Sequence, residues 1–172
     1  MSLIYPCEVP ANSLLRVYKD GVGYADCYVV EVQGSITQKD FIKAFYTSHL
    51  FRIERTILKY IASSPATDDD AKQLAAGMAT RISAWRVEEQ SASELLLADF
   101  TGRTRSWLMA KPVCGLATPS TTLLHFGSAV VSQKSRGARE PSMGWLFHAL
   151  LCFHRLYSRL LLLAAIRRIR NG

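Results

Sequence analysis

The sequence predicts an α+β domain in which an antiparallel sheet packs against a long C-terminal helix. In residues 23–32 and again over 81–131, apolar side chains recur with a period of two, which is typical of β-strands. Residues 143–170 form instead one long, strongly apolar stretch with the periodicity of a helix. A chain of 172 residues with 49% hydrophobic content has the size of one domain, 1–172, with a single core.

The first strand is expected at residues 23–32, "GYADCYVVEV", after an extended N-terminal segment that covers residues 1–13. The stretch is rich in β-branched and aromatic residues, which favour strands. Alternation along this strand places one set of side chains on the same face: Tyr24, Asp26, Tyr28, Val30 and Val32.

Two to three short helices should follow this strand. Thr37 can cap a helix that begins near Gln38, and the polar residues 47–49 divide the apolar pattern into two consecutive helices. A third helix within 63–77 begins after a capping Thr67, and the aspartates 68–70 suit its positive end. A metal site is the alternative reading of these aspartates, but the helix-start reading is favoured.

Four further strands are expected at 81–90, 93–100, 103–110 and 121–131, of which the second and third are joined by a tight turn at Gly102. With the first strand they form an antiparallel sheet of at least five strands. The connections 111–120 and 132–142 are rich in Pro, Gly and Ser and are expected to be loops, of the kind that act as lids near a cavity.

The C-terminal helix is not expected to span a membrane, because His148, His154, Arg155 and Arg159 interrupt its apolar run below the ~20 residues that a span needs. Its wide apolar face needs a partner, and the sheet is the available one.

Four sequence blocks, "GYADCYVVEV", "TGRTRSWLMAKP", "LHFGSAVV" and "FHALLCFHRLYSRLLLLAA", and the order of the predicted elements resemble the START-like (SRPBCC) superfamily. This superfamily includes plant pollen allergens, lipid-transfer domains and polyketide cyclases, and the four blocks also resemble an uncharacterised bacterial family within it. The resemblance covers about residues 14 to 169 and rests on element order, so it transfers no catalytic residues. It implies the helix-grip fold, in which a curved antiparallel sheet wraps around the C-terminal helix and leaves an apolar cavity between them.

The favoured function is to bind or carry a small hydrophobic ligand, lipid or polyketide-like, in that cavity. The expected pocket residues are aromatic or polar and come from the strands and the last helix: Asp26, Tyr28, Trp85, Arg105, Trp107, His125, Phe126, Trp145 and His148.

Arg105 and Trp107 share one face of their strand, and the sequence leaves open which face that is. Facing the cavity, Arg105 could bind a ligand carboxylate, with Trp107 as an apolar wall. Facing outward, it would be a solvated surface residue that could lie over the Trp107 ring. This structural reading is favoured, because burial of an unpaired arginine is costly. His125 is similarly either a general acid or base in the cavity or, more in keeping with the lack of a triad spacing, a structural histidine.

Two alternatives have a different function. A cofactor-free cyclase or hydrolase-type enzyme would use Asp26, Arg105 or His125, and a peripheral membrane or partner-binding module would use the basic C-terminal helix. No cofactor and no metal site is predicted. The four cysteines have no spacing typical of metal ligands and are expected to be ordinary reduced thiols: Cys7, Cys27, Cys114 and Cys152.

The net charge of +7 does not by itself indicate a nucleic-acid partner. Basic residues cluster only near the C-terminus, around residues 155–170, and no basic stripe with interleaved aromatics follows any other element. Nucleic-acid binding is therefore not expected. The N-terminus lacks the pattern of a secretion signal, so a cytoplasmic location is predicted. No feature of the sequence predicts an oligomeric state.

Overall fold

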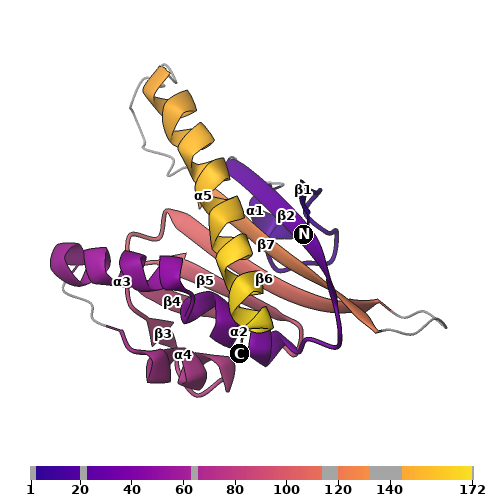
Figure 1. The fold of residues 1–172 in the computed structure, drawn as a ribbon. Coiled ribbons are helices and arrows are strands. Elements are labelled where there is room, and N and C mark those ends of the chain that lie inside the picture. Colours follow the sequence, from indigo (N-terminus) through magenta and orange to yellow (C-terminus); the bar gives the residue numbers. More distant parts are fainter. Residues whose placement is uncertain (1–2, 20–22, 63–65, 114–119, 132–144, 172) are drawn as a thin grey trace.

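The computed structural model describes residues 3–19, 23–62, 66–113, 120–131 and 145–171 (Figure 1). Its strands are β1 (Ile4–Pro6), β2 (Gly23–Gln33), β3 (Arg81–Ile82), β4 (Trp85–Gln90), β5 (Glu94–Asp99), β6 (Thr104–Val113) and β7 (Thr121–Val131). Its helices are α1 (Arg16–Lys19), α2 (Gln38–Tyr46), α3 (His49–Ala62), α4 (Asp68–Ala75) and α5 (Trp145–Arg170).

The strands form one seven-stranded antiparallel sheet in the order β1-β2-β7-β6-β5-β4-β3. The predicted α+β class is confirmed, and β1 and β3 extend the predicted minimum of five strands. The expected strand 81–90 is divided into β3 and β4, because Ser83 adopts a positive φ of 50° between them. The last strand, β7, pairs with β2 along its whole length and with β6 from Thr121 to Val130, so it is an interior strand of the sheet.

The helix starts follow the predicted capping residues. The Thr37 hydroxyl accepts a hydrogen bond from the Asp40 amide at 3.1 Å and caps α2. Thr67 and Asp70 form a reciprocal capping box at the start of α4, so the aspartate run serves the helix terminus, as favoured. At the break between α2 and α3, the Thr47 hydroxyl donates to the Lys43 carbonyl at 2.8 Å.

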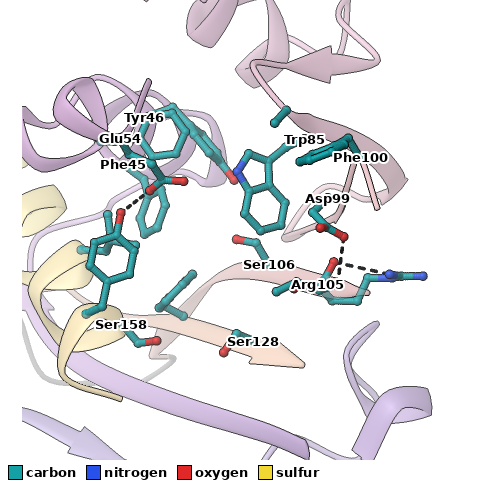
Figure 2. Close-up of a pocket in the computed structure, with 16 residues that line it drawn as sticks. Phe45, Tyr46, Glu54, Trp85, Asp99, Phe100, Arg105, Ser106, Ser128 and Ser158 are labelled. Carbon is teal, nitrogen blue, oxygen red and sulfur yellow. Dashed lines mark hydrogen bonds between the residues drawn. The ribbon is translucent and has the colours of Figure 1, made fainter. Parts of the chain in front are cut away.

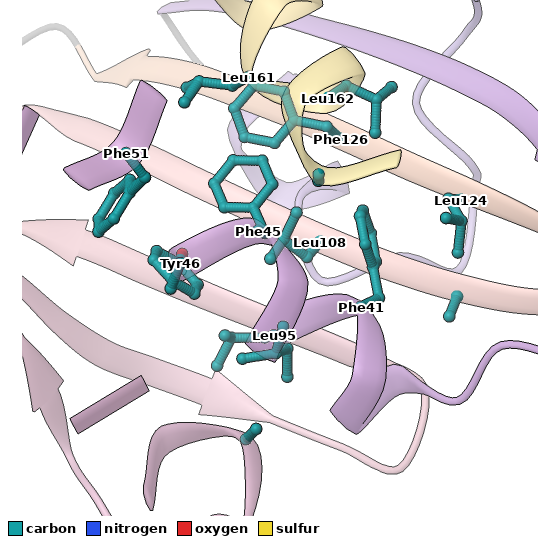
Figure 3. Close-up of a cluster of buried hydrophobic side chains, with 14 of the residues drawn as sticks. Phe41, Phe45, Tyr46, Phe51, Leu95, Leu108, Leu124, Phe126, Leu161 and Leu162 are labelled. Carbon is teal, nitrogen blue, oxygen red and sulfur yellow. The ribbon is translucent and has the colours of Figure 1, made fainter. Parts of the chain in front are cut away.

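One face of the sheet, called here the helical face, carries the main core (Figure 3). The aromatic side chains of α2 lie directly on β6 and β7, and the Phe45 and Phe126 rings are 5.0 Å apart between centroids. The C-terminal half of α5 packs beside α2 and over β2 and β7 through Leu161, Leu162, Ala165 and Ile166. The helix α2 and the C-terminal half of α5 thus lie side by side on the helical face.

The opposite face, called here the N-terminal face, is also buried. Leu96, Trp107 and Met109 of the sheet are covered there by Val9 and Leu15. Residues 7–19 therefore fold across the sheet, with α1 at their end, although the sequence predicted only an extended segment. Both faces of the central strands are consequently removed from water, which stabilises the sheet through burial of apolar surface.

The long helix α5 crosses the helical face, and its N-terminal turns extend beyond the sheet (Figure 1). Within the described part of the chain, neither α5 nor another helix combines the length and the hydropathy needed to cross a bilayer.

Candidate functional site

A cavity of about 250 Å³ lies on the helical face, between α2, α3, α5 and the ends of β4 to β7 (Figure 2). Seven aromatic side chains contribute to its wall: Phe45, Tyr46, Phe51, Trp85, Phe100, Phe126 and Tyr157. Phe100 is 69% exposed and marks the rim, where Trp85 and Asp99 also border a surface depression over β3 and β4. The cavity therefore opens to solvent beside Phe100, where β5 ends and β4 begins.

Two serines on neighbouring strands give the cavity a polar floor. Ser106 of β6 and Ser128 of β7 are register partners, so their side chains lie side by side. The Ser128 hydroxyl donates to Asp26 Oδ1 at 2.5 Å, and the Tyr24 hydroxyl lies 3.3 Å from Asp26 Oδ2. Asp26 is thus held by hydroxyl groups behind this floor.

Two buried hydroxyl groups at the cavity lack a hydrogen-bond partner among the described residues: those of Tyr46 and Ser158. Each side chain is only 1% exposed. Burial raises the pKa of Tyr46 well above its usual range, and Ser106 lies close enough to offset part of this shift without reaching hydrogen-bonding geometry. A buried polar group without a partner is costly, so these hydroxyls indicate where a polar atom of a guest would be stabilised.

A carboxyl group closes the cavity on the side of α3. Glu54 accepts a hydrogen bond from the Tyr157 hydroxyl of α5 (Figure 2). Burial raises the pKa of Glu54, while the Tyr157 hydroxyl and Trp85 act in the opposite direction. Burial, with Glu54 beside it, also raises the pKa of Tyr157, so its hydroxyl is neutral and remains a donor.

Four of the predicted pocket residues lie on the helical face. Trp85 and Phe126 form part of the cavity wall. Asp26 lies behind its floor, as described. Tyr28 belongs to the adjoining core, with the Arg159 guanidinium 5.2 Å from the centre of its ring.

Arg105 and Trp107 point to the N-terminal face, away from the cavity. Arg105 Nε lies 2.7 Å from a carboxylate oxygen of Glu88, and its guanidinium covers the Tyr18 ring at 4.8 Å. The backbone of Arg105 borders the cavity, but its side chain leads away from Phe45 and Tyr46 (Figure 2). Arg105 thus faces away from the cavity, as favoured, but it is largely buried rather than solvated and covers Tyr18 rather than Trp107. Trp107 is fully buried and donates from Nε1 to Glu94 at 2.7 Å.

His125 also lies on the N-terminal face, 6.2 Å from the Trp107 ring. It is 8% exposed, and burial lowers its pKa. Because Asp26 lies on the opposite face of the sheet, the three residues of the enzyme alternative, Asp26, Arg105 and His125, cannot converge on one substrate.

For two predicted pocket residues, the structure describes only the backbone, which is part of α5. Trp145 and His148 lie in its first turns, and their side chains are outside the described part of the molecule. Residues 114–119 and 132–142 of the predicted lid loops also lie outside the described residues.

Sequence reasoning missed the polar residues that distinguish this cavity: Tyr46, Glu54, Ser106, Tyr157 and Ser158. Alternation along β6 does place Ser106 and Leu108 on the face that Arg105 does not share. Once it was known that this face carries the cavity, the sequence would have predicted that Ser106 points into it. Tyr46, Glu54 and Ser158 are polar positions within helices whose partners only the tertiary structure supplies. Among the described residues, no cluster of three or more metal-ligating side chains occurs.

Comparison with known proteins adds no relative: no family description, no curated protein and no solved structure matches this chain.

Proposed function

We propose that this protein binds a small, largely apolar molecule with one uncharged hydrogen-bonding group in the cavity between the sheet, α2, α3 and α5. One observation carries the proposal. An aromatic cavity of about 250 Å³ contains two buried hydroxyls, of Tyr46 and Ser158, that have no partner among the described residues. Concave apolar sites with few convergent polar groups are typical of ligand-binding pockets.

The volume favours a compact ligand. A cavity of about 150 Å³ can hold one benzene molecule, whereas sites for drug-sized ligands begin at about 300 Å³. A molecule of one or two fused rings is therefore the expected size, rather than a long acyl chain. Phenolic compounds and small polyketide-like aromatics belong to this class.

The charge of the wall favours a neutral ligand. Among the described lining residues, Glu54 and Asp99 are acidic, and the single cation, Arg105, is paired with Glu88 on the other face. A ligand carboxylate would therefore be desolvated without a counter-charge and close to Glu54. A hydroxyl or carbonyl group could instead bond to Tyr46 and Ser158.

Membership of the START-like superfamily and the helix-grip fold remain our inference from the sequence. The antiparallel sheet with a C-terminal helix over one face supports it, as does a cavity at the place where such proteins bind ligands. The cytoplasmic location likewise remains a prediction.

The proposal can be tested with 2-naphthol, naphthalene and 2-naphthoate as probes, using calorimetric titration of the full chain. We expect saturable one-to-one binding of 2-naphthol, and weaker binding of 2-naphthoate. Tyr46→Phe should weaken 2-naphthol binding roughly 5- to 10-fold, which corresponds to one lost hydrogen bond, and should leave naphthalene binding unchanged.

Tyr5→Phe is the matched control, because it removes an exposed hydroxyl remote from the cavity. Ser158→Leu should block all three probes, since its longer side chain would occupy the cavity. If 2-naphthol did not bind, or if Ser158→Leu bound it as well as the unaltered protein, the proposal would be wrong.

A further inference from the structure

Cys7 and Cys27 are neighbours on the N-terminal face, although they lie 20 positions apart in the chain. The β1–β2 pairing aligns Ile4 with Val30 and Pro6 with Tyr28, so the next pair in this register is Cys7 with Cys27. The Cys7 amide donates to the Cys27 carbonyl at 2.9 Å, and the Cys7 thiol lies 3.0 Å from Cys27 Sγ. Both cysteines are free thiols in the structure.

We infer that Cys7 and Cys27 form a reversible disulfide that fastens the N-terminal segment to the sheet. Directly opposed residues of antiparallel strands have Cα atoms about 4.5–5.5 Å apart, within the range of about 4.4–6.8 Å found for disulfides. Bond formation needs the sulfur atoms to approach by roughly 1 Å, since a disulfide bond is about 2.05 Å long. The strand register therefore already supplies the required placement.

The two thiols differ in access, which sets the order of the chemistry. Cys27 is 2% exposed and packs in the cluster around Trp107, whereas Cys7 is half-buried. The neighbouring Cys27 thiol lowers the pKa of Cys7, against the effect of burial, and the Cys7 thiol together with burial raises the pKa of Cys27. Cys7 is accordingly the entry point, because the thiolate is the nucleophile and must be accessible.

The oxidant is a low-molecular-weight disulfide, RSSR. The Cys7 thiolate attacks one sulfur of RSSR, which forms a mixed disulfide at Cys7 and releases RS⁻, protonated to RSH. The Cys27 sulfur, on losing its proton, then attacks the Cys7 sulfur and releases the second RS⁻. In total, two protein thiols are oxidised to one disulfide, and one RSSR is reduced to two RSH.

The consequence is a covalent tie across the segment that covers the N-terminal face. The closed loop contains α1 and Leu15, whose side chain lies over Gly127 and Trp107. Such a loop reduces the conformational freedom of the unfolded chain, and its closure should raise Tm by roughly 5–10 °C.

The test is to incubate the full-length protein with excess glutathione disulfide and digest it with trypsin without reduction. Trypsin cleaves after Arg16 and Lys19, so the bond would join peptide 1–16 to peptide 20–39. We expect this linked pair in mass spectrometry, the loss of two thiols per chain, and the rise in Tm, all reversed by dithiothreitol.

Cys7→Ser should abolish both the linked peptide and the Tm rise, whereas Cys152→Ser should change neither. Because Cys27 is buried, the Cys27→Ala variant is compared only after circular dichroism shows that it is folded. If that variant does not fold, Cys7→Ser alone provides the test. The inference is overturned if Cys7 stops at a mixed disulfide with glutathione, or if the bond joins Cys114, Cys152 or a second chain.

Discussion

The side-chain amide of Gln38 donates a hydrogen bond of 3.1 Å to the backbone carbonyl of Leu108. The same carboxamide accepts a hydrogen bond of 2.7 Å from the Ala110 amide, so the first residue of α2 is bonded twice to β6. Gln38 is buried, and these bonds fix the start of α2, the helix whose Phe45 and Tyr46 line the cavity, to β6. A helix is thereby fixed to a strand by polar contacts inside an apolar core.

Replacement of this glutamine should destabilise the fold. Gln38→Leu keeps a similar volume but leaves the buried Leu108 carbonyl without the Gln38 amide, while Ala110 keeps its bond to the Ser93 carbonyl. We expect a loss of about 1–3 kcal/mol in the free energy of unfolding, measured by urea denaturation. Gln73→Leu on the exposed side of α4 is the control and should change stability by less than about 0.5 kcal/mol. Equal effects of the two substitutions would contradict the assigned role of Gln38.

Gly127 makes room for the N-terminal segment. A Cβ atom at this position would lie 2.5 Å from Leu15 Cδ2 and 3.0 Å from Trp107 Cε3. Gly127→Ala should therefore cost about 1–3 kcal/mol through overpacking. Leu15→Ala alone should cost about 2–5 kcal/mol through the cavity it creates, and the double variant should cost less than the sum by at least about 0.5 kcal/mol. Additive losses, measured by the same denaturation, would show that the two residues do not share this space.

Glu54 should make the protein less stable as the pH rises. Burial raises its pKa above the ordinary value of 4.5, so the folded state binds this proton more tightly than the unfolded state. The stabilisation is full below about pH 4.5 and is lost as the pH rises through the folded pKa. Glu54→Gln keeps an acceptor for Tyr157 and should remove this dependence, which thermal unfolding between pH 4 and 8 measures. Exposed Glu89→Gln is the matched control, and an unchanged slope in Glu54→Gln would refute the assignment.

His125 should have the opposite effect. Burial lowers its pKa below the ordinary value of 6.5, so the unfolded state takes up this proton more readily than the folded state. The stabilisation that the buried, neutral His125 gives the folded state is full above about pH 6.5, and it is lost as the pH falls through the pKa of His125 in the folded state. His125→Gln should therefore lose less stability on acidification from pH 7 to pH 5 than the unaltered protein. His49→Gln, at an exposed position of α3, should leave the acid profile as it was; a similar change in both variants would argue against a buried neutral His125.

Local rules in the sequence predicted the elements well. Thr37 and Thr67 begin helices because their hydroxyls can bond to free amides of the first turn. The strand expected at 121–131 is β7 with the same bounds, because its β-branched and apolar pattern is bordered by turn residues. The main local error, one strand in place of β3 and β4, arises at Ser83, whose positive φ has no strong sequence signal.

The sequence by itself determined the α+β class, most helix and strand positions, and which side chains share a face of each strand. Only the tertiary structure decided which face the helices cover, because alternation has a period of two on either face and both faces of this sheet are buried. It therefore turned Arg105, Trp107 and His125 towards the N-terminal segment and Ser106 towards the cavity. Contacts such as Cys7 with Cys27 and Glu54 with Tyr157 join residues far apart in the chain, and long-range packing, which local propensity does not encode, brings them together.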